Sequence, residues 1–198
     1  MKIETLSPSH YFSSNTYLIS SGGEYAVIDP STRHHESLVP GRLKYILLTH
    51  SHFDHILDID EWAEGGAEVV IFESEADFLS DPERNCYRLF NGSAKGYFGK
   101  VRTAHDGQVF SLGDEEFTLM HLPGHTIGSS AYVFDGVAFV GDTVFAGGGF
   151  GRCDLPSGNA YMLVNSIERL LSLPDETILY CGHGDPTTVK QYKIDTKR

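Results

Sequence analysis

The chain has 198 residues, of which 40% are apolar and 21% are charged, and its formal net charge is −12. This length and composition are typical of one globular domain, so we expect residues 1–198 to form a single domain with a full core. Such a negative surface repels phosphate backbones and disfavours nucleic acid as a partner. No apolar run approaches the roughly 18 residues of a membrane span, and the N-terminus lacks the pattern of a signal peptide. We therefore expect no membrane partner and a cytoplasmic location.

Short runs rich in Val, Ile, Tyr and Phe follow one another through both halves of the chain. Glycine, aspartate or proline bounds most of these runs, a pattern that predicts β-strands. The predicted strands cover residues 16–20, 25–29, 44–49, 68–72, 117–122, 130–134, 137–141 and 177–181. The sequence SGGE (21–24), between the first two strands, predicts a hairpin turn.

Helices are predicted over residues 56–64, 74–80 and 160–172. In the second of these, Ser74 is a candidate N-cap. The third has the apolar stripe of an amphipathic helix and Asn159 as a candidate cap. This stripe consists of Leu163, Ile167, Leu170 and Leu171.

The stretch 81–104 scatters Gly, Asn and Pro among aromatic residues. We interpret it as a long loop that covers another part of the molecule. The predicted strands form neighbouring pairs, with helices between some of them. This order favours two sheets with helices on the outside over one parallel sheet.

The segment THSHFDH (49–55) directly follows a predicted strand. His50 and His52 are two residues apart, so their side chains point the same way in an extended backbone, and Asp54 repeats that spacing. With His55, this places three imidazoles and a carboxylate close together, which would be costly if all were protonated. A divalent metal accepts neutral imidazole nitrogens and carboxylate oxygens, so the segment predicts a metal site.

Three further candidate ligands, His125, Asp142 and His183, also follow predicted strands. Because each comes directly after a β-run, all three can converge on one edge of the sandwich. The complete set of candidate ligands is His50, His52, Asp54, His55, His125, Asp142 and His183. Seven ligands are too many for one tetrahedral zinc ion and suit two metals that share a carboxylate.

These motifs resemble those of the metallo-β-lactamase superfamily, and within it the glyoxalase II-like (hydroxyacylglutathione hydrolase-like) metallohydrolases. The similar segments are NTYLI (15–19), VIDP (27–30), LLTHSHFDH, LPGHTIGSS, VGDTVF, GRCDLPSGN (151–159) and YCGHGDPTT (180–188). The resemblance implies an α/β fold, the four-layer αβ/βα sandwich. In glyoxalase II proper, a helical C-terminal domain contributes to glutathione binding, and we expect no such domain in residues 1–198.

The resemblance also implies a first metal site of His50, His52 and His125, a second of Asp54, His55 and His183, and a bridging Asp142. The implied cofactors are two divalent ions, Zn²⁺ before Fe or Mn, because imidazole and carboxylate suit all three metals. A hydroxide between the metals would attack a carbonyl, and Asp54, as the catalytic residue, would orient it and accept its proton. The lactamase branch proper uses a cysteine at its second metal, so Asp142 argues against specialisation for β-lactams.

We therefore expect a thioester hydrolase that acts on a small molecule, S-lactoylglutathione or a related acyl thioester. A persulfide dioxygenase with one iron is the alternative, since GRCD (151–154) resembles both groups. Within it, Arg152 and Asp154 form either an ion pair or a contact to substrate. The acidic charge disfavours a nuclease. The intact ligand set disfavours a non-enzymatic binding module. The sequence does not indicate an oligomeric state.

Overall fold

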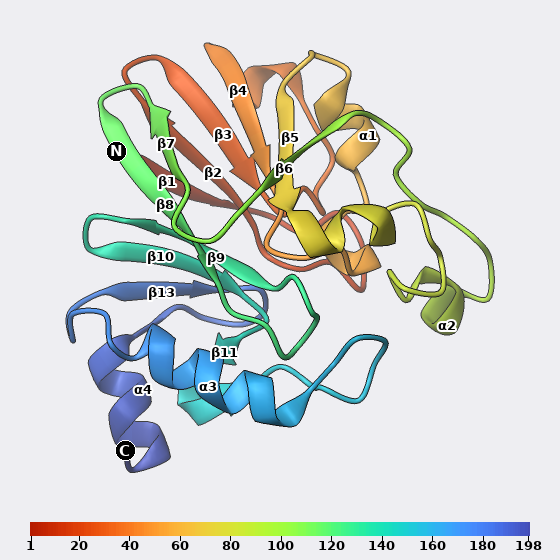
Figure 1. The fold of residues 1–198 in the computed structure, drawn as a ribbon. Helices are drawn as coiled ribbons and strands as arrows, with labels where there is room; N and C mark the ends of the chain where they lie inside the picture. The colour runs from red at the N-terminus through yellow and green to blue at the C-terminus, as the bar shows by residue number, and fades with distance from the viewer.

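The computed structural model describes residues 1–198 apart from the side chain of Glu36. Two six-stranded sheets pack against each other (Figure 1). The helix α1 (Ile59–Ala63) lies beyond the first sheet, while α3 (Ala160–Leu170) and α4 (Val189–Thr196) lie below the second. The predicted four-layer αβ/βα sandwich is therefore confirmed. Among the residues described, no helix combines the length and apolarity needed to cross a membrane.

The first sheet is built from the N-terminal half of the chain. Its strands, in spatial order, are β1 (Lys2–Leu6), β2 (Thr16–Ser21), β3 (Glu24–Ile28), β4 (Arg42–Leu47), β5 (Glu68–Phe72) and β6 (Val101–Ala104). Strands β3 to β6 run parallel, so the segments that follow them lie at one edge. Ser21 pairs with Glu24 across the turn between β2 and β3, which confirms the predicted hairpin.

The second sheet is built from the C-terminal half. Its strands, in spatial order, are β14 (Thr187–Thr188), β13 (Ile178–Cys181), β10 (Val137–Gly141), β9 (Ser130–Phe134), β8 (Glu115–His121) and β7 (Val109–Leu112). Strands β10 and β13 pair in parallel and therefore end at the same edge. A two-stranded ribbon of β11 (Val144–Phe145) and β12 (Gly149–Phe150) follows β10.

Three apolar layers hold the sandwich together. An aromatic-rich layer fills the space between the sheets and includes Tyr17, Tyr45, Phe117, Tyr132 and Phe139. Trp62 of α1 packs on the outer face of the first sheet. Leu163, Ile167 and Leu170 of α3 pack on the second. Burial of these side chains is the main favourable contribution to folding, and it holds the strand ends in place.

Helix α3 confirms the predicted amphipathic helix. It begins at Ala160, and the side chain of Asn159 accepts a hydrogen bond of 3.0 Å from the Met162 amide. The prediction for 56–64 is correct in place but too long: α1 covers Ile59–Ala63, and residues 56–58 form a bend and turn that link it to a preceding 3-10 turn, η2 (Phe53–His55).

The prediction for 74–80 is wrong in helix type and in its cap. Residues Glu73–Phe78 form a 3-10 helix, η3, which leaves β5 directly from the extended residue Phe72. No side chain caps it, so Ser74 is not an N-cap. Two further 3-10 turns are η1 (Glu36–Leu38) and η4 (Ala146–Gly148).

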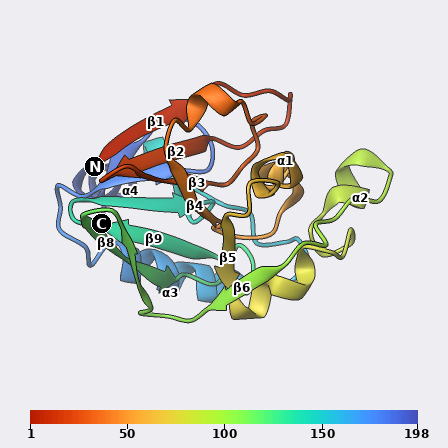
Figure 2. The ribbon, with the colours of Figure 1, turned by 90° about the horizontal axis from the view of Figure 1, so that it is seen from above.

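The interpretation of 81–104 as one long loop is also wrong. The stretch contains α2 (Tyr87–Asn91) and the strand β6. Strand β6 has one buried residue, Ala104, and exists because it pairs with β5. Helix α2 projects from the body of the molecule on the side of α1 (Figures 1 and 2).

Candidate metal centre

All seven predicted ligand side chains gather at one edge of the sandwich. Those from His50 to His55 lie in the segment that follows β4, whereas His125 follows β8. Asp142 and His183 follow the parallel neighbours β10 and β13. The structure thus brings together groups that are far apart in the sequence, as three overlapping sets of candidate metal ligands.

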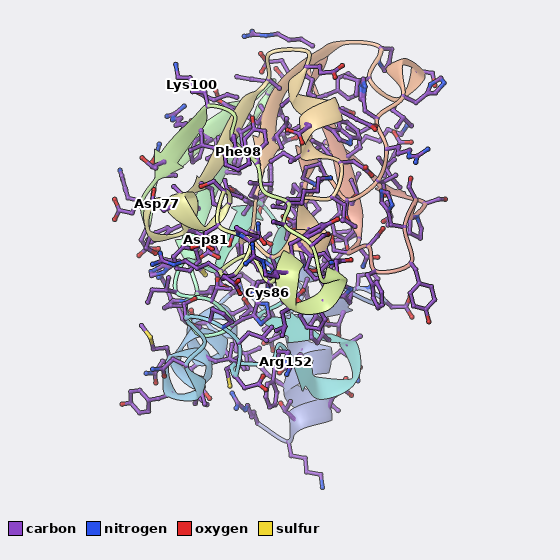
Figure 3. All side chains as sticks on the ribbon, turned by 90° about the vertical axis from the view of Figure 1, so that its right-hand side faces the viewer. Asp77, Asp81, Cys86, Phe98, Lys100 and Arg152 are labelled. Atoms are coloured by element: carbon purple, nitrogen blue, oxygen red, sulfur yellow. The ribbon has the colours of Figure 1, made fainter. Side chains whose placement is uncertain are left out.

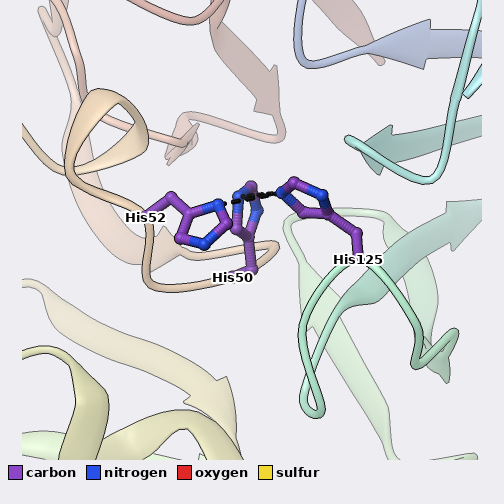
Figure 4. A group of neighbouring side chains, drawn as sticks. All are labelled: His50, His52 and His125. Carbon is purple, nitrogen blue, oxygen red and sulfur yellow. Dashed lines mark hydrogen bonds between the residues drawn. The ribbon is translucent and has the colours of Figure 1, made fainter. Parts of the chain in front are cut away.

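The first set is a triad of buried histidines (Figure 4). The Nε2 atom of His125 lies 3.2 Å from Nε2 of His50 and 2.9 Å from Nδ1 of His52. All three residues are at most 4% exposed. Three ring nitrogens converge on one point, where a metal ion can accept all three lone pairs.

The second set consists of Asp54, His55 and His183. The Nε2 atom of His183 lies 3.2 Å from Oδ2 of Asp54. The third set, His50, His55 and Asp142, overlaps the other two. Asp142 lies between them: its Oδ1 is 3.3 Å from Nε2 of His55, while its Oδ2 is 3.6 Å from Nε2 of His183 and 3.7 Å from Nε2 of His125. A carboxylate that faces both sets fits the position of a bridging ligand.

Unpaired buried atoms support a metal in this place. Nε2 of His55 and Oδ1 of Asp142 are buried, and although they lie 3.3 Å apart, neither makes a well-oriented hydrogen bond with a described residue. Leaving such a group unpaired costs roughly 1–3 kcal/mol, which coordination would offset. Burial and the imidazole of His125 lower the pKa of His52 to about 3, and burial with the imidazoles of His55 and His52 lowers the pKa of His50 well below its usual value. Both rings are therefore neutral at pH 7, with lone pairs available to a metal.

Around Asp142 and His55, in contrast, the site favours a positive charge. Burial alone would raise the pKa of Asp142, but the imidazoles of His55 and His125 hold it well below its usual range. Burial alone would lower the pKa of His55, but the carboxylates of Asp142 and Asp29 raise it well above its usual value. A proton on His55 or a divalent cation can supply this charge, and a cation that binds releases the proton. The donor set therefore fits two divalent metal ions.

Asp29 orients His55 directly and His50 through Thr49, a role that the sequence did not predict. Its carboxylate accepts hydrogen bonds from Nδ1 of His55 (2.8 Å) and from the hydroxyl of Thr49 (2.7 Å). That hydroxyl can in turn accept from Nδ1 of His50, 3.1 Å away. A proton on Nδ1 leaves the Nε2 lone pair directed at the centre. Asp29 lies in the segment VIDP (27–30), which lacks the spacing of metal ligands. The pairing of β3 with β4 brings Asp29 beside Thr49.

The GRCD segment (151–154) contains an ion pair, one of the two alternatives for Arg152 and Asp154. The guanidinium of Arg152 donates two hydrogen bonds of 2.7 Å to the carboxylate of Asp154, and both side chains are exposed. The backbone carbonyl of Arg152 also accepts a hydrogen bond from Nδ1 of His125 at 2.6 Å. The segment therefore orients a candidate ligand through its backbone and leaves the guanidinium at the surface.

A cavity of about 480 Å³ opens onto the centre. His52, His125, Asp142 and His183 contribute to its lining, together with the aromatic side chains of Tyr11, Phe12, Phe53, Phe90 and Phe145. Cys86 and Arg152, which also line the cavity, lie on one face of the molecule (Figure 3). This volume and this mixture of apolar walls with a few polar groups suit a small-molecule substrate.

Gly182 allows the close approach of β13 to the centre. A Cβ atom on this residue would lie 2.1 Å from Oδ1 of Asp142 and 2.7 Å from Cε1 of His55. We expect Gly182→Ala to displace the Asp142 carboxylate and to lower metal affinity about tenfold or more. Metal titration of the purified variant checks this. Gly65→Ala is the control, because its Cβ meets no atom within 4 Å. Parental metal affinity in Gly182→Ala would contradict the assignment of Asp142.

Comparison with known proteins agrees with this geometry. Residues 11–183 match the sequence profile of the metallo-beta-lactamase superfamily. The chain is 33% identical over 169 residues to hydroxyacylglutathione hydrolase GloC of Haemophilus influenzae, a match that covers 76% of this chain and 73% of that protein.

Three solved structures with a similar fold are described as different proteins. The structure of BLEG-1, described as a B3 metallo-beta-lactamase, has a TM-score of 0.89 at 29% identity and covers 98% of this chain and 97% of its own. TTHA1623 in a di-iron-bound form has a TM-score of 0.83 at 30% identity and covers 99% and 98%. ETHE1 from Myxococcus xanthus has a TM-score of 0.77 at 27% identity and covers 100% and 84%.

Proposed function

Because the chain belongs to the metallo-β-lactamase superfamily, we propose that it is a cytoplasmic, metal-dependent thioester hydrolase of the glyoxalase II-like kind. The observation that carries the proposal is the position of Asp142 between two sets of ligands, next to an open cavity. A centre of this form suits two metals, with Zn²⁺ the first candidate. The similarity to GloC supports an acyl thioester, with S-lactoylglutathione as the first substrate to test.

A bound pair of divalent ions supplies a nucleophilic hydroxide at neutral pH and polarises a carbonyl oxygen. His50, His52 and His125 would hold one ion, Asp54, His55 and His183 would hold the other, and the Asp142 carboxylate, which faces both sets, would contact both. Asp54 keeps 19% of its side chain exposed and lines the cavity, where it can accept a proton from the attacking oxygen. In the overall reaction a C–O bond forms at the acyl carbon, the C–S bond breaks, and the thiol leaves with a proton.

The cavity walls would bind the rest of the substrate. Aromatic rings such as Phe12 and Phe90 offer apolar contact to the acyl or thiol part. Arg152 is among the residues that line the same cavity, and an exposed ion pair such as the one with Asp154 is weak enough to be exchanged for a substrate carboxylate.

Metal content and turnover test the proposal together. We expect close to two metal ions per chain and hydrolysis of S-lactoylglutathione that a chelator abolishes and Zn²⁺ restores. Elemental analysis and release of free thiol measure these quantities. The likeness to BLEG-1 adds a β-lactam to the compounds assayed. A protein with two metals that hydrolyses a β-lactam and no thioester would overturn the proposed substrate class.

A persulfide dioxygenase with one iron is the second candidate. It is favoured by the structural similarity to ETHE1 along the whole chain and by ligands that suit iron as well as zinc. Oxygen uptake with a persulfide substrate discriminates between the two. One iron per chain together with persulfide-dependent oxygen consumption would replace the hydrolase proposal.

A further inference from the structure

Glu75, in the 3-10 helix η3, is a fully buried acidic residue that lies outside the proposed ligand set. Its exposed fraction is 0%. Burying a carboxylate is costly unless hydrogen bonds or an opposite charge compensate it. Among the described side chains no ion pair involves Glu75, so its compensation comes from hydrogen bonds.

Three donors surround this carboxylate. Oε1 accepts from the backbone amide of Ser51 at 3.1 Å and from the Ser51 hydroxyl at 2.7 Å. Oε2 accepts from the backbone amide of Gly128 at 2.9 Å. Ser51 lies between His50 and His52, and Gly128 lies three residues after His125. One side chain thus connects the two loops that carry all three histidines of the first triad.

The connection leaves little freedom for the loops to move. A Cβ atom on Gly128 would lie 2.6 Å from Cβ of Glu75 and 2.7 Å from its Oε2, so this loop packs directly against the Glu75 side chain. Hydrogen bonds to an ionised acceptor are roughly twice as strong as neutral ones. The carboxylate therefore fixes the separation between the His50–His52 segment and the His125 loop.

We propose that Glu75 is a positioning residue for the first metal site. It holds Ser51 and Gly128 at a set distance and so keeps the nitrogen atoms of His50, His52 and His125 converged before a metal binds. Less rearrangement is then needed when the ion enters, which raises metal affinity. The inference rests on the proposed metal site and adds a residue that contacts no metal and no substrate.

Glu75→Gln is the direct test, because it keeps the shape and removes one acceptor. The amide offers one oxygen and one NH₂ group, so either Ser51 or Gly128 faces a donor. We expect the affinity for the tighter-bound Zn²⁺ to fall about 10- to 100-fold, measured by competition with a chromophoric chelator. We also expect the visible spectrum of the Co²⁺-loaded protein to change, which reports ligand geometry independently of turnover.

Phe134→Ala is the matched control for stability. Phe134 is buried between the sheets and pairs with Val137 at the start of β10, whereas Asp142 follows the end of that strand. The Phe134→Ala substitution should lower the melting temperature and leave metal affinity and the Co²⁺ spectrum unchanged. Should Glu75→Gln not fold, Ser51→Ala removes one of the three bonds and is expected to weaken Zn²⁺ affinity a few-fold.

The outcomes separate this inference from the proposed function. If Glu75→Gln keeps the parental metal affinity and Co²⁺ spectrum, the role of Glu75 is overturned and the proposed function is not. The same holds if Phe134→Ala, at the same melting temperature, loses as much metal affinity as Glu75→Gln. A parent protein that binds no metal overturns the proposed function and this role with it. Lost affinity and an altered spectrum in Glu75→Gln, with both retained in the control, support the inference.

Discussion

Asp142→Ala is expected to lose metal and nearly all thioester hydrolysis. Its two oxygens lie 3.3–3.7 Å from three ligand nitrogens, so both proposed metals depend on this carboxylate. Its removal also leaves the pKa of His55 without the carboxylate that raises it most. We expect kcat/KM to fall at least roughly a thousandfold, which corresponds to about 4 kcal/mol of lost transition-state stabilisation. Elemental analysis and thiol release measure the two losses.

His52→Ala tests the same centre from the first triad, and we expect it to lose metal and nearly all activity as well. Asp175→Ala is the matched control: Asp175 forms an exposed ion pair with Lys193, so its loss should leave metal content and turnover at the parental level. Full metal content and turnover in Asp142→Ala or His52→Ala would show that the site is assigned wrongly.

Asp54→Asn is expected to retain part of the metal and to lose far more rate than binding. Burial alone would raise the pKa of Asp54, but its hydrogen bond with His183 and the nearby His55 lower it, so the carboxylate is ionised at neutral pH. An amide at this position can coordinate a metal weakly, but it cannot accept a proton or balance charge. We expect kcat to fall roughly 100- to 1000-fold while KM changes little.

The kinetic constants for S-lactoylglutathione, measured together with metal content, check this expectation. Asp58→Asn is the control, because Asp58 is also a buried carboxylate beside a histidine, 2.8 Å from Nε2 of His10, and lies outside the candidate ligand sets. It should keep the parental kcat. Comparable kcat in Asp54→Asn and the parent would remove Asp54 from the catalytic step, even if its role as a ligand survived.

The sequence by itself determined the parts of the protein that depend on local pattern. Apolar runs bounded by turn residues predicted the central strands, since a strand buried on both faces is apolar along its length. Asn159 and the stripe after it predicted α3 for the same local reason. The seven candidate ligands could be chosen because each follows a strong strand, and strands that end at one edge deliver their next residues to one place.

Only the tertiary structure decided the elements and contacts that carry no local signal. The edge strands β1 and β6 have mostly exposed or half-buried residues, and the edge strand β7 has only two buried residues. None of the three is a long apolar run, so pairing with a neighbouring strand makes them strands. Asp29 and Glu75 are single carboxylates with no ligand spacing, and their roles follow from partners 20 to 53 residues away. Such long-range hydrogen bonds depend on which chain segments the fold places side by side. The order of residues alone does not give the distance between those segments.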